Sequence, residues 1–408
     1  MDSLTQIVLG AACGEVVAGK KIGNRAMIWG GIAGTIPDLD VLSEFVADEI
    51  TALAFHRGIS HSLLFAFLAP ALFGYLTKRL YDSGLYQQKG WKIGITLFWI
   101  ALMALPVIFS MSSNGVSGFP VIYLIALALI VFALSRSYWK RDLKQVEMPW
   151  KQWYLLFFVA IITHPLLDCC TSYGTQIFQP FSNTRVAWDN IAVADPAYTV
   201  PFMIPLIIAA FFRENIRVRS ILNWTGIGLS SLYMTWTVSN KLHADQVFEA
   251  SLEKENIEYH RYRVSPTILN NILWSGVAET DSAFYIGQYS LYDEEEIFSP
   301  LSRVEKNHHL IVGHEDDPDI QTLTWFSDDY YALFVNKKGI LQYNDMRFGT
   351  FDGDVSSEDK FIFHFYLKEE DGELKASQDE TERPDIDGQT FIDFYERIKG
   401  VKAPLPQD

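Results

Sequence analysis

The chain has 408 residues and a net charge of −16, and this charge is unevenly divided along its length. Residues 1–240 hold 17 Lys/Arg and 14 Asp/Glu, a charge of +3, whereas residues 241–408 hold 16 and 35, a charge of −19. The acidic second part argues against nucleic acid as a partner, and its lack of cysteine excludes a disulfide-built domain. We therefore expect two domains that divide near residue 240.

Long apolar stretches in the first part predict membrane-spanning helices, because such a helix needs roughly 17–25 mostly apolar residues. In chain order, two short stretches and six longer candidates are Leu4–Ala18, Ala26–Ile36, Leu63–Thr77, Ile93–Met111, Phe119–Leu134, Trp153–Leu167, Pro196–Phe212 and Ile221–Val238. Glycine and alanine in the short pair suit close helix packing in lipid, as a spanning hairpin or a re-entrant pair. We predict an α-helical multi-pass membrane bundle of about 6–8 transmembrane helices, followed by a soluble α+β C-terminal domain.

Lys and Arg are unevenly distributed among the segments that would connect these helices. Segments 20–25, 78–92, 136–151 and 213–219 hold 15 of them, whereas segments 37–61, 112–118 and 171–196 hold only Arg57 and Arg185. The positive-inside rule places the first set in the cytoplasm. We therefore expect a protein of the cell (inner) membrane, with the acidic domain outside the cytoplasm. The N-terminus has no positively charged n-region and carries Asp2, so we expect no cleavable signal peptide.

The acidic second part has the pattern of a soluble α+β domain. Alternation of apolar and polar residues predicts strands over Ser282–Tyr292, Thr322–Asn336 and Phe361–Leu367. Gln389–Ile398 is typical of a terminal helix. No catalytic motif is visible in this part, so we expect the domain to serve substrate access or partner contact.

Six His and Asp side chains lie at the ends of the predicted helices that face outside. They are Asp38 and Asp40 in Pro-Asp-Leu-Asp, His56 and His61 in His-Arg-Gly-Ile-Ser-His, and His164 and Asp168 in His-Pro-Leu-Leu-Asp. Ionisable side chains near hydrocarbon are costly to hold, so they are rare there and usually functional. Structural polar residues would scatter over both faces, whereas these share one. The six side chains therefore predict a single metal centre.

Each of these motifs also has a simpler interpretation. Asp38 can cap a helix, and Asp168 can orient His164 through a hydrogen bond instead of binding a metal. Two histidines on either side of an Arg-Gly turn favour ligation, because such a turn can aim both imidazoles at one point. Cys169 and Cys170 fit better as small buried residues than as thiolate ligands.

The predicted outer loop over residues 171–194 is long, aromatic and almost free of cations. Such a loop can be a lid over a site, although aromatic side chains at a membrane boundary are also anchors. Arg57 and Arg185 are the only Lys or Arg residues in the outer loops that precede the acidic domain. Because guanidinium groups suit phosphate and carboxylate recognition, we expect one of them to contact an anionic substrate.

Four segments taken together resemble a known family. Over roughly residues 1–200 the chain resembles the YdjM-like family of membrane-bound metal-dependent hydrolases. The segments that carry the resemblance are Met-Asp-Ser-Leu-Thr-Gln, Gly-Thr-Ile-Pro-Asp-Leu-Asp, His-Arg-Gly-Ile-Ser-His-Ser and Thr-His-Pro-Leu-Leu-Asp. Their order is also distantly similar to that of bacterial zinc-dependent phospholipase C. Many relatives carry His where this chain has Gln6, and glutamine is a poorer zinc ligand, so one coordination position differs.

The resemblance implies a centre of roughly one to three Zn²⁺ ions, or another divalent metal, that acts on phosphoesters. Its metal ligands would be Asp38, Asp40, His56, His61, His164 and Asp168, with Asp40 a ligand or a base. Membrane lipids are the expected partners and a lipid or lipid-linked molecule the expected substrate, while the oligomeric state stays open.

Two functions fit these residues. In the first, a zinc-activated water attacks a phosphoester or lipid-linked ester at the outer membrane face, while a neighbouring zinc or Arg57 polarises the scissile ester. In the second, the protein is a membrane transporter or a metal-binding scaffold without catalysis. Transporters usually hold their ligands at mid-bilayer on broken helices related by internal repeats. No such repeat is visible and the ligands gather at one end, so the sequence favours a hydrolase.

Overall fold

The computed structural model describes residues 1–98, 100, 128, 132, 139, 145–336, 338–350, 353, 355, 361–378 and 388–401. Contacts divide the chain into two compact units, one of Met1–Ala69 with Leu156–Asp408 and one of Pro70–Leu155. The candidate site and both sheets lie in the first unit.

A helical hairpin comes first. α1 (Ser3–Ile22) and α2 (Asn24–Thr35) are joined by Gly23, whose φ of 59° is a left-handed conformation that glycine adopts at little cost. The helices pack so closely that a Cβ added at Gly14 would lie 2.1 Å from the Ala26 carbonyl oxygen. The close packing of small residues predicted for this pair is confirmed.

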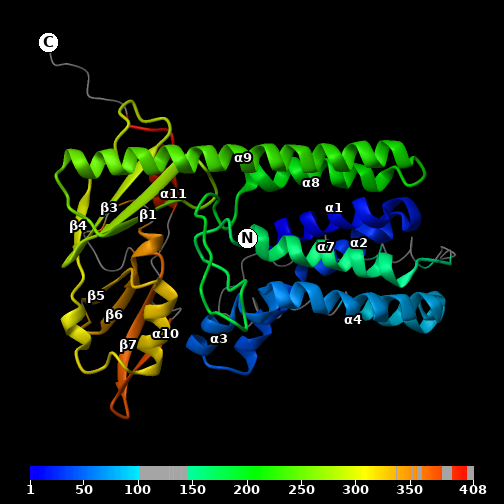
Figure 1. Cartoon of the computed structure of the whole chain (residues 1–408), viewed down its shortest axis with the longest axis horizontal. Helices are drawn as coiled ribbons and strands as arrows, with labels where there is room; N and C mark the ends of the chain where they lie inside the picture. The colour runs from blue at the N-terminus through cyan, green and yellow to red at the C-terminus, as the bar shows by residue number, and fades with distance from the viewer. Residues whose placement is uncertain are drawn as a thin grey trace. The chain divides into compact units, whose positions relative to one another are not determined.

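Further helices follow the hairpin along the chain. They are η1 (Pro37–Phe45), α3 (Glu49–Phe55), η2 (Ile59–His61), α4 (Leu63–Asp82), η3 (Leu85–Gln87), α7 (Trp150–Asp168), α8 (Pro196–Phe211) and α9 (Ile216–Lys254). α1 contacts α8 and α9, and Val8, Phe202 and Leu206 are buried in the core of the first unit. α8 and α9 lie side by side, and α9 then continues along the strands (Figure 1).

Close packing of α1 and α2 predicts a strong effect of a single added methyl group. Gly14→Ala must push the two backbones apart, which should cost about 1–3 kcal/mol. Gly228→Ala on α9 is the matched control, because no atom lies within 4 Å of its added Cβ. Alanine there should stabilise the helix by up to about 1 kcal/mol. Thermal unfolding in detergent should thus shift in opposite directions, and equal shifts would contradict the close packing.

A buried ion pair joins α1 to α9. The Nε of Arg219 donates to Oε1 of Glu15 at 3.0 Å, and its Nη2 donates to Oε2. Nη1 donates to the side-chain oxygen of Asn24, the first residue of α2. Both charged residues are buried, and a buried charge is costly unless it is paired. The pair therefore helps to determine how three helices meet.

Within the second unit, α4 and α7 approach each other closely. A Cβ added at Gly74 would lie 3.0 Å from the Tyr154 amide nitrogen, and the rings of Tyr81 and Trp153 stack at 5.3 Å. Small and aromatic side chains therefore make this contact.

Two four-stranded antiparallel sheets form in the acidic part of the chain. The first, in the order β1-β2-β3-β4, contains Arg261–Pro266, Leu273–Glu279, Ala283–Ser290 and Ser302–Glu305. The second, in the order β5-β6-β7-β8, contains Tyr331–Val335, Leu341–Asp345, His364–Glu370 and Glu373–Ser377. Each strand pairs with its neighbour in sequence, with Val277 opposite Ile286 and Leu333 opposite Tyr343. Phe248 of α9 packs against the first sheet beside Trp274.

Helices accompany these sheets: η4 (His308–Ile311), α10 (Pro318–Ser327), η5 (Met346–Phe348) and α11 (Gly388–Ile398). The strand predicted over Ser282–Tyr292 and the terminal helix over Gln389–Ile398 are confirmed. The strand predicted over Thr322–Asn336 is partly wrong, because its first residues belong to α10. The buried side chains of Ile320, Leu323 and Phe326 recur every third residue, which is a helical spacing.

α3 connects the helical part to the second sheet. Ile50 is buried in the core that contains Leu333 and Tyr343, and the Glu49 carboxylate accepts a hydrogen bond of 3.0 Å from the Gln378 amide. We name the part of the chain that contains the two sheets the sheet domain. The segment between Asp40 and His56 is therefore held by the sheet domain. α9 runs through residue 240, and the domain boundary near that residue stays a prediction.

The prediction of a bundle of about 6–8 transmembrane helices is wrong for the residues that the structure describes. Among them, Leu63–Asp82 alone is long and apolar enough to cross a membrane, and Pro196–Phe211 is a shorter apolar helix. α2 has 12 residues, about 18 Å at 1.5 Å per residue, which is less than the roughly 30 Å of hydrocarbon. The candidates Ile93–Met111 and Phe119–Leu134 lie largely outside the described residues.

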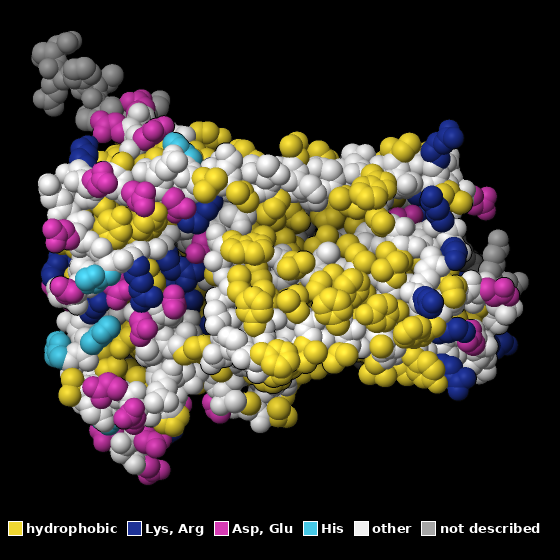
Figure 2. All heavy atoms as spheres, viewed as in Figure 1, with side chains coloured by type: hydrophobic (Ala, Val, Ile, Leu, Met, Phe, Trp, Pro, Cys, Tyr) yellow, Lys and Arg dark blue, Asp and Glu magenta, His cyan; other side chains and the backbone are white. Residues whose placement is uncertain are grey.

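Apolar and charged side chains are segregated on the surface. In Figure 2, apolar side chains cover much of the helical part on this face, whereas acidic side chains gather over the sheets. On α9 the exposed apolar residues include Ile221, Trp224, Leu232 and Leu242. Exposed apolar surface of this kind marks contact with lipid or with other protein.

Candidate metal centre

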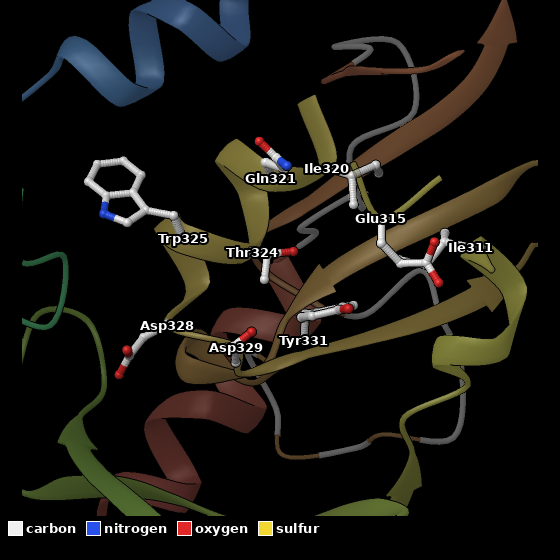
Figure 3. Close-up of a pocket in the computed structure, with 9 residues that line it drawn as sticks. All are labelled: Ile311, Glu315, Ile320, Gln321, Thr324, Trp325, Asp328, Asp329 and Tyr331. Carbon is white, nitrogen blue, oxygen red and sulfur yellow. The ribbon is translucent and has the colours of Figure 1, made fainter. Parts of the chain in front are cut away.

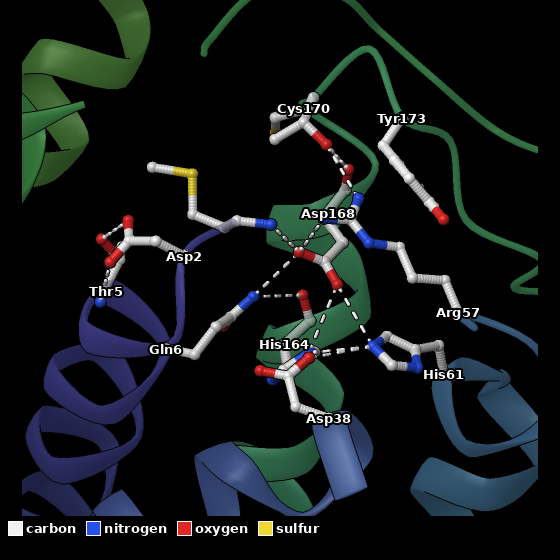
Figure 4. A network of polar contacts seen from close by, with 12 residues as sticks. Asp2, Thr5, Gln6, Asp38, Arg57, His61, His164, Asp168, Cys170 and Tyr173 are labelled. Atoms are coloured by element: carbon white, nitrogen blue, oxygen red, sulfur yellow. Dashed lines mark hydrogen bonds and ion pairs between the residues drawn. The ribbon is translucent and has the colours of Figure 1, made fainter. Parts of the chain in front are cut away.

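Four side chains from three elements meet at one point (Figure 4). Asp38 comes from η1, His61 from η2, and His164 and Asp168 from the end of α7. The Nε2 atoms of the two histidines are 3.1 Å apart, and each lies 3.3 Å from Oδ2 of Asp168. Oδ1 of Asp38 lies 3.5 Å from Nε2 of His61 and 3.2 Å from Nε2 of His164. Potential ligand atoms of all four residues lie within 4.8 Å of one another.

Local sequence explains how these residues reach one point. α7 stays helical through Pro165, so His164 and Asp168 are four residues apart on one face. Gly58 lies before η2, where a Cβ would come 2.7 Å from the Phe55 carbonyl oxygen, so the turn between the two histidine positions needs glycine.

The spacing of these atoms fits a bound divalent cation. Tetrahedral ligands with bonds of about 2.0–2.1 Å lie about 3.3 Å apart, and the measured separations between the histidine Nε2 atoms and their neighbours run from 3.1 to 3.5 Å. Two imidazole nitrogens and two carboxylate oxygens are also a donor set that zinc and neighbouring transition metals accept. The residues present therefore fit the expected metal.

Hydrogen bonds at the other ring nitrogens orient both imidazoles. Nδ1 of His164 lies 2.6 Å from the Gly34 carbonyl oxygen, and Nδ1 of His61 lies 3.2 Å from Oδ2 of Asp40. A protonated Nδ1 that donates to these oxygens leaves Nε2 as a lone-pair donor. Both Nε2 lone pairs then face the centre.

Asp40 and His56 lie outside the group of four. Oδ1 of Asp40 is 2.9 Å from Nδ1 of His56, while Oδ2 accepts hydrogen bonds from the Arg57 amide at 2.9 Å and the Ser60 hydroxyl at 3.0 Å. Asp40 is thus occupied with orienting neighbours, including His61. The His56 side chain is one-third exposed.

Arg57 lies beside the centre in a constrained backbone conformation. Its φ of 57° is uncommon for a residue other than glycine. Nη1 donates to the Thr171 hydroxyl at 2.9 Å, Nη2 lies 3.7 Å from Oδ1 of Asp168, and the guanidinium lies 4.7 Å from the Tyr173 ring centre. Nε is buried without a hydrogen-bond partner. One donor of this arginine therefore has no hydrogen-bond partner, while another lies beside Asp168.

Several donors contact Oδ1 of Asp168, the carboxylate oxygen that does not face the two histidines. The sequence did not indicate this feature. Nε2 of Gln6 donates to Oδ1 at 3.1 Å and to the His164 carbonyl oxygen at 3.3 Å, and the Met1 α-nitrogen also contacts Oδ1. These contacts leave Oδ2 directed toward the two histidines. Gln6 acts here through its amide nitrogen on Asp168. The sequence singled out Gln6 only as the position where many relatives carry His, and this did not predict its contact with Asp168.

Charge interactions shift the protonation of the centre. Burial alone would lower the pKa of His61, but hydrogen bonds to Asp168, Asp38 and Asp40 outweigh it and raise this pKa to about 10. Burial opposes ionisation of Asp38, yet hydrogen bonds from His164 and His61 hold its pKa below the usual range. A metal at Nε2 of His61 must therefore displace a proton, so metal affinity should fall as the pH falls.

Both cysteines that follow Asp168 stay protonated. Burial raises the pKa of the Cys169 thiol to about 11 and that of Cys170 to about 12. Neither thiol belongs to the group of four. They behave as small buried residues.

Arg185 makes its contacts with Tyr173 and with α10. Its guanidinium is 4.9 Å from the Tyr173 ring centre and 4.0 Å from that of Phe326, and Nη1 donates to the Phe326 carbonyl oxygen at 3.2 Å. Phe326 belongs to α10. Arg185 therefore attaches the 171–194 loop to the sheet domain.

A pocket separate from the metal centre lies in the sheet domain beside α10 (Figure 3). It has a volume of about 420 Å³ and is lined by Ile311, Glu315, Ile320, Gln321, Thr324, Trp325, Asp328, Asp329 and Tyr331. Its carboxylates are exposed and are not part of the metal-type cluster found among the described residues. We assign it no chemistry.

The position of Asp40 predicts a supporting effect on metal affinity. Asp40→Asn removes the charge that orients Nδ1 of His61, and loss of such a partner typically lowers metal affinity about 10–100-fold. Asp48→Asn is the matched control, because Asp48 caps α3 away from the ligands and asparagine can replace it there. Metal competition with a fluorescent chelator measures both affinities. Unchanged affinity in Asp40→Asn would show that this carboxylate has no role at the centre.

Comparisons with known proteins agree with the resemblance noted from the motifs. The model of the family described as YdjM inner membrane protein matches residues 1–116 and 120–244. Over 84 residues the chain is 33% identical to the inner membrane protein YbcI of Escherichia coli (strain K12), which covers 21% of this chain and 49% of that relative. The chain thus matches about half the length of this relative. No solved structure matches, and similarity to phospholipase C is not shown. The chain belongs to the YdjM family of inner membrane proteins.

Proposed function

We propose that this protein is a metal-dependent hydrolase of the inner membrane, with Asp38, His61, His164 and Asp168 as its metal ligands. The observation that carries the proposal is the convergence of four residues, in which the histidine Nε2 atoms lie 3.1–3.5 Å from each other and from the two carboxylate oxygens. A divalent cation such as zinc, when bound, supplies a Lewis acid and lowers the pKa of a bound water to about 7. Membership of the YdjM family supports the membrane location.

Arg57 is the residue that we assign to substrate charge. Its buried Nε has no partner, and its guanidinium is held in place by Thr171 and the Tyr173 ring. A positioned guanidinium stabilises the charge that develops on a phosphoester oxygen. Asp40 orients His61 in this scheme, and it serves as a positioning residue with His56 as its partner.

The substrate class that we propose is a phosphoester or lipid-linked ester at the outer membrane face. Arg57 supports an anionic head group, and exposed apolar side chains on the helices support contact with membrane lipids. We place the sheet domain outside the cytoplasm, where it covers the loop beside the centre. Asp189 on that loop makes a bidentate ion pair with Arg263 of β1, at 2.7 Å for the shortest contact.

One observation favours a second candidate, a metal-binding scaffold without catalysis. Four protein ligands already complete a tetrahedral shell, which is typical of structural zinc sites, whereas catalytic sites keep a position open for water. The Asp38 side chain is 22% exposed, more than the other three. A hydrolase requires that the shell expand or that Asp38 make room.

Metal analysis and an ester panel together test the proposal. The purified protein should bind a divalent metal in a stoichiometric amount and hydrolyse a member of a phosphodiester and phospholipid panel, with activity lost on chelation and restored by metal. Asp168→Ala should lose both properties, while His260→Ala, an exposed histidine paired with Asp281, should keep both. Stoichiometric metal without turnover on any ester would favour the scaffold, and full metal content in Asp168→Ala would remove the site.

A further inference from the structure

An exposed apolar edge lies on the same element that carries the first ligand. η1 and the residue after it expose Leu39, Leu42, Phe45 and Val46, which we name the apolar lip. Phe45 is 83% exposed and Val46 is 88% exposed. Single exposed apolar residues are ordinary, but a continuous group marks an interaction surface.

Exposed apolar side chains also occur on α2, which precedes the lip in the chain. Exposed side chains occur at Ile28 and Ile32 on α2 and then at Leu39 and Leu42 on η1. In a 3-10 helix side chains three residues apart lie on one face, so Leu39, Leu42 and Phe45 share one side of η1. Exposed apolar side chains therefore occur on α2 as well as on one side of η1.

The lip follows the metal ligand Asp38 along the chain, but its side chains face solvent. Asp40 is buried toward His61, while its neighbours Leu39 and Val41 are exposed. At about 2.0 Å per residue in a 3-10 helix, Phe45 lies roughly 14 Å along the axis from Asp38. An amphiphile whose hydrocarbon lies on the lip would have its head group near the ligands.

Charges around the lip limit how deeply it can enter an apolar phase. Glu44 and Asp48 are both exposed beside Phe45 and Val46. Charged side chains are costly in hydrocarbon, so these two carboxylates would keep the lip at the boundary of a bilayer and out of its interior. Membership of an inner membrane family makes a lipid surface the occupant available to it.

We propose that the apolar lip enters the lipid surface and holds the hydrocarbon of an amphiphilic substrate beside the metal centre. The insertion stands on the exposure and continuity of the lip alone. The substrate part rests on the proposed hydrolase function. The substrate class is then a lipid ester presented from the bilayer rather than a water-soluble one.

Quenching by lipid tests insertion without any activity. In a background with Cys13, Cys169 and Cys170 replaced by alanine, Val46→Cys carries an environment-sensitive fluorophore in phosphatidylcholine nanodiscs that contain doxyl-labelled lipid. Val312→Cys is the matched control, an exposed valine beside η4 in the sheet domain. We expect strong quenching at Val46→Cys and none at Val312→Cys. An unquenched label at Val46→Cys, whether in water or covered by another protein, overturns the insertion.

A substrate comparison tests the second part. Phe45→Ser with Val46→Ser should lower kcat/KM for a lipid ester in nanodiscs at least about tenfold, the effect of losing one buried apolar side chain. Hydrolysis of a short-chain soluble ester and metal content should stay within about twofold, which also reports on folding. An equal loss on both substrates would overturn the presentation of substrate by the lip. If no ester is hydrolysed by the native protein, the hydrolase proposal fails and the quenching result still decides the insertion.

Discussion

Replacing His61 by alanine should abolish stoichiometric metal binding. The ring is completely buried, and its Nε2 lies within 3.5 Å of potential ligand atoms from each of the other three residues. Loss of a residue that only orients a metal ligand lowers metal affinity about 10–100-fold. Loss of a ligand itself should therefore lower the affinity more than about 100-fold. Elemental analysis and calorimetric titration of the purified variant measure the two quantities.

A stability measurement adds an independent readout. A ligand that binds the folded state raises its stability by about 2.7 kcal/mol at 100 times the dissociation constant. The unfolding temperature of the native protein should therefore rise with added metal, while that of His61→Ala should not. His56→Ala is the informative control, because His56 is outside the group of four and should keep the metal. Metal retained in His61→Ala and lost in His56→Ala would reverse the assignment of ligands.

Arg219→Ala should be the most destabilising change outside the metal centre. The substitution leaves the buried carboxylate of Glu15 without its bidentate partner and removes a contact to Asn24. Breaking a buried ion pair by removing one partner typically costs about 3–5 kcal/mol. Thermal or denaturant unfolding in detergent gives the difference from the native protein.

A surface arginine provides the matched comparison. Arg303 pairs with Glu305, and both side chains are about half exposed, so Arg303→Ala should cost about 0–1 kcal/mol. Glu15→Met combined with Arg219→Met removes both charges and should recover much of the stability that Arg219→Ala loses. A loss in Arg219→Ala no larger than that in Arg303→Ala would show that the pair contributes little to the fold.

The candidate ligands were accessible from sequence because their chemistry is local. His164 and Asp168 are four residues apart in a helix, and that spacing alone places them on one face. The sequence did not show that Asp38 belongs to the four ligands while Asp40 does not, because the two residues lie two positions apart in the same motif. Only the fold directs Asp38 toward His164 and Asp40 toward His56.

The predictions of the fold were wrong where one local sequence pattern is compatible with two structures. Apolar runs predicted spanning helices, but helix length is set by where each helix stops, and α2 stops after 12 residues at the start of η1. Around α10, alternation and a three-residue spacing overlap in the same residues, and packing of Phe326 and Leu323 favours the helix. Local patterns do not contain this packing energy.

The sequence by itself determined which side chains are available: the acidic second part, the closely packed small residues of the hairpin and the His and Asp motifs with Arg57. Composition and short-range spacing carry that information, because both depend on neighbours along the chain. The tertiary structure alone decided that four ligands converge, that Asp40 supports His61 and that α3 is held by the sheet domain. These depend on contacts between residues far apart in the chain, such as His61 and His164, whose positions are determined by packing of the whole unit.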